Sequence, residues 1–236
     1  CWNSPFDAAR QEKMDKVLSR SLSVILQAQN VKKPPNHAGG WRYQPNSTDS
    51  DLSLTGWCIM ALRAGKLNGA PVPAANIEKA VKYVLKTRHP QFGGFAYHPG
   101  SAPNIGLTAS GVLCLELCGQ HGHKAIAPAA EYIRKSQPKA YDASMNGCYA
   151  RYYYGQAAFQ LGPKFWANFA PQMFKNVLVA QQPDGRWPPA DGTCGSCFST
   201  AMNILAMTPA YRQLPIYQRD QTYESEGLSA PGEQQP

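Results

Sequence analysis

Apolar residues recur at three- and four-residue steps in four separate segments of the chain. In the first segment Leu18, Leu22 and Leu26 form one stripe, with polar side chains such as Arg20 between them. This spacing is typical of an amphipathic helix that lies on a core with one face and meets solvent with the other. We therefore expect four outer helices. They span about residues 11–29, 75–87, 125–136 and 166–181.

A second set of four segments is apolar nearly all round and carries few charges. Such segments are typical of helices that are buried on most faces. They cover about residues 51–66, 104–118, 148–161 and 194–207. Because outer and inner segments alternate along the chain, we predict an all-α fold with an inner and an outer helical layer.

The pairing of outer and inner segments repeats with a nearly constant period. Aligning Thr55, Thr108, Tyr154 and Thr200 gives intervals of 53, 46 and 46 residues. A period near fifty corresponds to one helix pair per repeat. We predict a repeat domain of about four helical hairpins over residues 11–217. An N-terminal arm (1–10) precedes it, and an acidic, Pro-containing tail (218–236) follows.

Two joints between the segments carry a shared signature. Gln29 precedes Gly40-Trp41, Gln181 precedes Gly185-Arg186-Trp187, and Gly94-Phe95 is a looser copy. These joints resemble the Gln…Gly-x-Trp repeats of the prenyltransferase and squalene-cyclase (terpenoid cyclase) superfamily. The resemblance implies a partial α/α toroid over most of the chain. Enzymes of that superfamily close their ring with about six pairs, so four would leave an open arc with apolar ends that something must cover.

The signature itself has a structural explanation. A Gln at the end of an outer helix can cap backbone groups of the next segment, while the Trp covers the joint. Such a motif indicates a fold and not an activity.

Charge is distributed unevenly along the chain. Lys and Arg total 23 against 15 Asp and Glu, a net charge of +8. The segment 220–236 holds four acidic and no basic residues, so residues 1–219 carry 23 − 11 = +12. The basic side chains mostly do not cluster and no base-reading module is visible, so we expect no nucleic-acid partner. No apolar run approaches the roughly 18 residues that a membrane helix needs.

Acid catalysis has one weak candidate. Class II cyclases of the superfamily protonate an alkene with Asp-x-Asp-Asp, and the nearest match here is Asp49-Ser50-Asp51, with Leu52 where the last Asp would stand. An Asp just before a helix more often caps it by accepting bonds from free backbone N–H groups. We therefore expect Asp51 to be a helix cap and name no catalytic residue.

Cysteines offer three alternatives at the start of the last inner segment. Protein prenyltransferases of the superfamily hold zinc with Asp, Cys and His, and the nearest set here is Asp191, Cys194 and Cys197. Shifting Cys148 by one repeat reaches Cys194, so a disulfide from Cys148 to Cys194 or Cys197 is a second alternative. Free thiols are the third. No His lies in the inner segments, and we expect no cofactor.

Aromatic residues supply the candidate binding site. These are Trp57, Tyr97, Tyr152, Tyr153 and Tyr154. They could stabilise a carbocation in an enzyme, fill the centre of a small toroid or contact a partner. Because no acid or complete metal site accompanies them, we predict a non-catalytic binding or scaffold subunit of a larger protein assembly. The alternative is an isoprenoid enzyme that binds a long apolar substrate in the toroid centre.

The first residue bears on localisation. A mature Cys1 is what remains after a lipoprotein signal peptide is removed. We therefore expect an exported protein, periplasmic or anchored as a membrane lipoprotein. A lipid on Cys1 could bring the basic body to a membrane surface.

Overall fold

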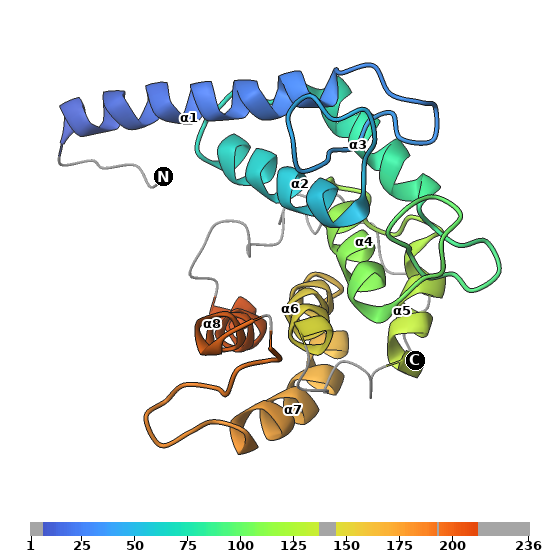
Figure 1. Ribbon diagram of the computed structural model, residues 1–236, viewed down its shortest axis with the longest axis vertical. Helices are drawn as coiled ribbons and strands as arrows, with labels where there is room; N and C mark the ends of the chain where they lie inside the picture. The colour runs from blue at the N-terminus through green and yellow to red at the C-terminus, as the bar shows by residue number, and fades with distance from the viewer. Residues whose placement is uncertain (1–6, 137–144, 193, 212–236) are drawn as a thin grey trace, which may run out of the picture.

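The computed structural model describes residues 7–136, 145–192 and 194–211, and these ranges are helical without any strand. The helices are α1 (Ala8–Gln29), α2 (Leu52–Leu67), α3 (Ala74–Lys86), α4 (Ile105–Leu117), α5 (Ile126–Ser136), α6 (Met145–Gln160), α7 (Pro163–Val179), α8 (Ser196–Met207) and the 3₁₀ helix η2 (Pro209–Tyr211) (Figure 1). Each α-helix boundary lies within three residues of the predicted one. The all-α prediction is confirmed. The arm and tail predicted at residues 1–10 and 218–236 fall largely outside the described residues.

The helices are arranged in two layers. The even-numbered helices α2, α4, α6 and α8 pack against one another in chain order and follow a curve (Figure 1). The odd-numbered helices pack on this row from outside: α1 on α2, α3 on α2 and α4, α5 on α4, and α7 on α6 and α8. The order of inner and outer helices is consistent with a partial α/α toroid.

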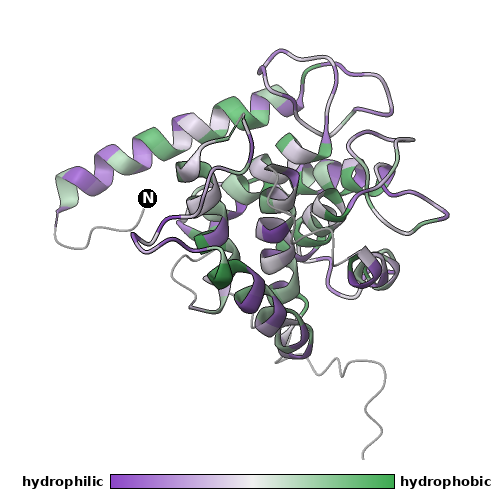
Figure 2. Cartoon of the chain, turned by 60° about the horizontal axis from the view of Figure 1, so that its bottom comes forward, coloured by the Kyte–Doolittle hydropathy of each residue, from purple (hydrophilic) through white to green (hydrophobic). Residues whose placement is uncertain are grey.

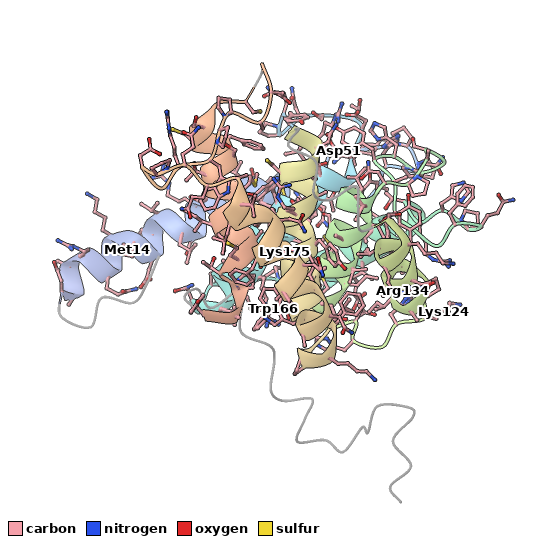
Figure 3. All side chains as sticks on the ribbon, turned by 90° about the horizontal axis from the view of Figure 1, so that it is seen from below. Met14, Asp51, Lys124, Arg134, Trp166 and Lys175 are labelled. Atoms are coloured by element: carbon pink, nitrogen blue, oxygen red, sulfur yellow. The ribbon has the colours of Figure 1, made fainter. Side chains whose placement is uncertain are left out.

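Among the helices, α4 in the middle of the row is the most buried, and α1, which packs on the first helix of the row, is far more exposed. All residues of α4 are buried, because α2, α3, α5 and α6 surround it. Helix α1 buries only Leu22 and Gln29. Its N-terminal half projects from the body with polar and apolar residues alternating (Figure 2), and Met14 lies on this projecting part (Figure 3). The first helix is thus held to the core mainly by its C-terminal half.

The joints between the outer and inner helices of three repeats share one hydrogen bond. The backbone N–H of Trp41, Phe95 and Trp187 donates to the hydroxyl of Thr55, Thr108 and Thr200, over 3.1, 3.0 and 3.0 Å. The indole N–H groups of Trp41 and Trp187 donate to carbonyls in the preceding outer helix, at 2.7 Å in both cases. These equivalent contacts confirm the alignment of three of the four repeats.

Gln29 ties the first repeat to the second. Its amide donates to the carbonyls of Gly39 and Asn76 over 2.8 and 2.9 Å, and its oxygen accepts from Asn76 Nδ2 at 2.6 Å. Gln29 thus bonds backbone groups as expected, but these belong to the α1–α2 loop and to α3 and not to α2, the next helix along the chain. Gln181 occupies the same place in the last repeat but is exposed, and it bonds only the nearby Gly185 carbonyl at 2.8 Å.

None of the described helices combines the length and apolar character required to cross a membrane.

Candidate functional site

A pocket of about 710 Å³ lies where the N-terminal ends of the even-numbered helices meet. Ser53 and Leu54 come from the first turn of α2, Ile105 and Gly106 from that of α4, and Phe198 from that of α8. The loops before α2 and α4, together with α5 and α6, complete the wall. They contribute Tyr43, Tyr97, Pro103, Asn104, Tyr132, Ser136, Asn146, Tyr149 and Ala150. The pocket therefore draws on all four repeats.

The described part of the pocket wall is mainly aromatic. Its rings belong to Tyr43, Trp57, Tyr97, Tyr132, Tyr149 and Phe198, and no Asp, Glu, Lys or Arg side chain among the described residues lines it. The Trp57 ring is stacked on Tyr152, with centroids 5.7 Å apart and planes 11° apart. Trp57 nevertheless remains 41% exposed. One indole face is thus held by the core while the side chain still reaches the pocket.

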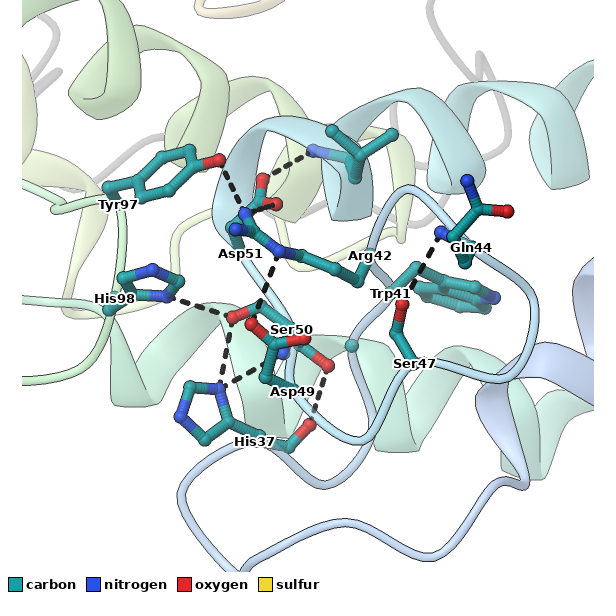
Figure 4. A network of polar contacts seen from close by, with 12 residues as sticks. His37, Trp41, Arg42, Gln44, Ser47, Asp49, Ser50, Asp51, Tyr97 and His98 are labelled. Carbon is teal, nitrogen blue, oxygen red and sulfur yellow. Dashed lines mark hydrogen bonds and ion pairs between the residues drawn. The ribbon is translucent and has the colours of Figure 1, made fainter.

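An ion-pair network forms the rim (Figure 4). Arg42 Nη1 donates to Asp51 Oδ2 and to the Tyr97 hydroxyl, both at 2.6 Å, and Arg42 Nε lies 3.2 Å from Asp49 Oδ2. The guanidinium also lies over the Tyr43 and Tyr97 rings, 5.3 and 5.5 Å from their centroids. The hydrogen bond to Asp51 raises the pKa of Arg42, and burial raises that of Tyr97 to about 12. Arg42 therefore stays cationic and Tyr97 stays neutral around pH 7.

Asp51 serves as the N-cap of α2. Its Oδ1 accepts from the Leu54 backbone N–H at 2.8 Å while its Oδ2 accepts from Arg42, and its side chain is fully buried. The capping prediction is confirmed. Each oxygen of Asp51 therefore accepts at least one hydrogen bond from within the protein. Asp49 is partly exposed and also faces Arg42.

The carbonyl of Ser50 anchors the two loops beside this network. The Tyr83 hydroxyl donates to it at 2.7 Å. The Nδ1 atoms of His37 and His98 each lie 3.0 Å from it (Figure 4). His37 Nδ1 also lies 3.1 Å from the Ser50 backbone nitrogen. These contacts hold the α1–α2 loop against the α3–α4 loop, and so fix the side of the pocket formed by Tyr43 and Tyr97.

The five aromatic residues expected to bind divide into two groups. Trp57 and Tyr97 line the pocket. Tyr152, Tyr153 and Tyr154 are buried: Tyr152 under Trp57, Tyr153 between Tyr149 and Tyr152, and Tyr154 against Phe169. The structure therefore places these three tyrosines in the interior, in agreement with the packing alternative.

Most of the pocket wall was not predicted from the sequence. Tyr43, Tyr132 and Phe198 were not among the candidate residues, and neither was Arg42, the centre of the rim. The run Trp41-Arg42-Tyr43 carried a usable signal, because an Arg beside exposed aromatic rings often packs over them.

No disulfide joins the six cysteines that the structure describes. Cys148 is buried, and Arg151 Nη2 lies 3.1 Å from its sulfur, whereas Cys197 is exposed. The disulfide considered among Cys148, Cys194 and Cys197 is not formed in the structure. Asp191 Oδ1 accepts from the Cys194 backbone N–H at 3.0 Å, and no group of three metal-ligating side chains occurs among the residues the structure describes. Asp191 thus closes a turn beside Cys194.

The described residues define an all-α repeat protein whose helix N-termini surround an aromatic pocket. Comparisons of the chain with protein-family models and with curated proteins give no match.

Proposed function

We propose that the chain is a non-catalytic α/α-toroid repeat module, a binding or scaffold subunit of an exported protein assembly, with the aromatic pocket as its binding site. The observation that carries the proposal is a large pocket that six aromatic rings, and no charged side chain of the described ranges, line. Trp and Tyr are enriched in the contacts that dominate protein–protein binding. Exposed aromatic side chains such as Tyr43 and Trp57 are suited to such a contact.

The surface outside the pocket adds support for an assembly. Val17 and Val24 on α1 and Ile204 on α8 are about half exposed, at 52, 52 and 45%. Helix α1 packs on α2, the first helix of the row, and α8 is the last. A partner could cover apolar surface at these two ends.

The alternative function is that of an isoprenoid enzyme. The aromatic walls favour it, because such rings can bind a long apolar chain and stabilise a cation. A cyclase would also need a carboxylic acid that holds a proton near the substrate. Asp51, the best candidate, is bonded to Arg42 and Leu54 instead.

Purification of the full chain from its native source, followed by light scattering, tests the proposal. We expect a complex with a second protein that Trp57→Ala dissociates. Phe92→Ala is the matched control, because Phe92 is 60% exposed but lies outside the pocket. A monomer with no partner would contradict the proposal. So would turnover of squalene or a prenyl diphosphate that Asp51→Asn abolishes, because Asn preserves the helix cap.

A further inference from the structure

Two histidines connect the loops on one side of the pocket, and their hydrogen-bonding roles are opposite. We infer that His37, Ser50 and His98 form a pH-sensitive clasp between the α1–α2 loop and the α3–α4 loop. The clasp is closed while His37 is neutral and loosens when His37 takes up a proton. It is a property of the chain's own loops, whereas its effect on partner binding rests on the proposed function.

The Nδ1 atom of His37 lies between two backbone groups of one residue. It accepts a hydrogen bond from the Ser50 N–H at 3.1 Å, and it lies 3.0 Å from the Ser50 carbonyl oxygen (Figure 4). Ser50 is fully buried, so its N–H needs an acceptor within the protein. A ring nitrogen accepts such a bond only while it carries no proton. The contacts therefore assign to His37 the neutral ring with its proton on Nε2.

His98 has the donor role. Its Nδ1 faces the Ser50 carbonyl oxygen at 3.0 Å, and because that oxygen can only accept, Nδ1 carries the proton. The Tyr83 hydroxyl donates to the same oxygen at 2.7 Å. A carbonyl oxygen has two lone pairs, which these two donors occupy. The Ser50 oxygen thus offers no place for a third donor from His37.

Protonation of His37 reverses its contact with Ser50. The imidazolium carries a proton on both nitrogens, so Nδ1 changes from an acceptor into a donor. The buried Ser50 N–H then loses its acceptor, and the Ser50 carbonyl, already bonded twice, does not compensate. Imidazole groups take up protons between about pH 5 and 8. Because the His37 ring is partly exposed, protons from solvent can reach it.

The charges on the α1–α2 loop do not favour a cation at His37. The carboxylates of Asp49 and Asp51 are both paired with Arg42, which the bond to Asp51 keeps cationic. Lys33 lies on the same loop, where its Nζ donates to the Gly40 carbonyl at 2.6 Å. The acidic groups nearest to the clasp are thus already matched by cations.

The other elements against the clasp add no negative charge from their facing groups. From α3, Lys86 Nζ donates to the Pro35 carbonyl at 2.6 Å, and burial raises the pKa of Tyr83, which stays neutral. On the α3–α4 loop, Tyr97 also stays neutral, because burial raises its pKa to about 12. The His98 ring centroid lies 5.6 Å from that of His37, so protonation of both rings adds repulsion between them.

A loosened clasp changes the wall of the pocket. The two loops carry Tyr43 and Tyr97, which line it. The loops remain linked closer to α2, where the Leu52 N–H donates to the Tyr97 carbonyl at 3.0 Å and Arg42 bonds the Tyr97 hydroxyl. We therefore expect a local loosening at the histidine end and not unfolding, with the aromatic rings of this wall less well fixed for a partner.

Nitrogen NMR of the full chain tests the clasp without a partner. At about pH 8 we expect the Nε2–H form of His37 and the Nδ1–H form of His98. As the pH falls, the Ser50 backbone amide signal should shift with the same midpoint as the His37 ring. A His37 ring with its proton on Nδ1 at about pH 8 would overturn the inference. So would a Ser50 amide that does not respond when His37 is protonated.

The native complex tests the effect on binding. Its affinity should be at least about fivefold lower at about pH 5.5 than at about pH 7.5, the scale expected for one unpaired buried group. His37→Asn should remove this difference, because the Asn amide oxygen can take the place of Nδ1 as an acceptor and does not titrate. His123→Asn is the matched control, because His123 Nδ1 accepts from the Ala125 N–H at 3.1 Å outside these loops. It should leave the difference unchanged.

The two experiments separate the clasp from the proposed function. A complex that weakens at acid pH equally with His37→Asn would contradict the inference and leave the proposed function standing. If the chain forms no complex at any pH, the proposed function fails, while the NMR titration still decides whether the clasp exists.

Discussion

The hydroxyl of Thr108 accepts a hydrogen bond from the backbone N–H of Phe95 at 3.0 Å while it donates to the Asn104 carbonyl at 2.6 Å. Thr55 and Thr200 accept the same bond from Trp41 and Trp187. One threonine in each of three repeats therefore connects an inner helix to the aromatic residue of the preceding joint.

Thr108→Val should lower the free energy of unfolding by about 1–3 kcal/mol. Valine keeps the shape of the side chain but leaves the buried Phe95 N–H without an acceptor. Urea denaturation of the purified chain measures the loss.

Thr108→Ser is the control for this prediction, because serine retains the hydroxyl. It should recover most of the stability lost in the valine variant. A valine variant as stable as the unmodified chain would mean that the hydrogen bond does not contribute, and a loss confined to the serine variant would assign the stability to the threonine methyl group.

The two Gln residues of the joints should differ in importance. Gln29→Leu removes the side-chain donor to the buried Gly39 and Asn76 carbonyls and the acceptor of Asn76 Nδ2, and we expect a loss of about 1–3 kcal/mol in the free energy of unfolding. Gln181→Leu changes an exposed side chain with one local bond, and we expect about 0.5 kcal/mol or less. Thermal unfolding followed by circular dichroism compares them. Similar midpoints for the two variants would contradict the prediction.

Gly155 marks a close approach between α6 and α8. A Cβ atom there would lie 2.5 Å from the Ala206 carbonyl oxygen, a backbone atom that cannot rotate away. Gly155→Ala should therefore cost about 1–3 kcal/mol of stability through overpacking. Gly192→Ala is the matched control, because an added Cβ there meets nothing within 4 Å. Chemical denaturation measures the stability of both variants. A Gly155→Ala variant as stable as the unmodified chain would contradict this close packing of α6 and α8.

The fold could be predicted from the sequence because its signals are local. Apolar steps of three and four residues indicated the four outer helices, and segments that are apolar nearly all round indicated the four inner ones. The position of Asp51 directly before an apolar segment also indicated its capping role. Each of these patterns lies within a short segment of the chain, and the repeated threonines then indicated the register of three repeats.

The pocket could not be predicted because its walls come from distant parts of the chain. Arg42 meets Tyr97 across 55 residues of sequence, and no local pattern specifies that contact. Helical periodicity also did not separate Tyr149, which lines the pocket, from Tyr153, which is fully buried. Helix α6 packs against α4, α7 and α8, so most of its faces are covered and only its first turns reach the pocket.

Stability should fall as the pH rises from about 9 to 12. Burial raises the pKa of the Cys58 and Cys118 thiols to about 12 from 9.0. Between these values the unfolded chain loses protons that the folded chain keeps, which favours unfolding by up to about 1.4 kcal/mol per pH unit for each thiol. The contribution of these two protonated thiols to the free energy of unfolding is fully present below pH 9 and is lost as the pH rises toward 12. Urea denaturation at increasing pH measures the slope.

Replacing both thiols, with Cys58→Ala and Cys118→Ala, should make this slope shallower whatever the stability at neutral pH. The slope should not disappear, because burial also raises the pKa of Tyr83 and Tyr153. An unchanged slope would show that these thiols do not set the alkaline limit.

The complete burial of α4 implies a gradient of local opening along the chain. Its amide groups can exchange with deuterated water only when neighbouring repeats separate, whereas those in the first half of α1 can exchange by local fraying. Exchange should therefore be slowest in α4 and become faster toward α1 and α8. The middle of the chain would then remain folded while the outermost helices open, so a partner could be admitted at either end without global unfolding.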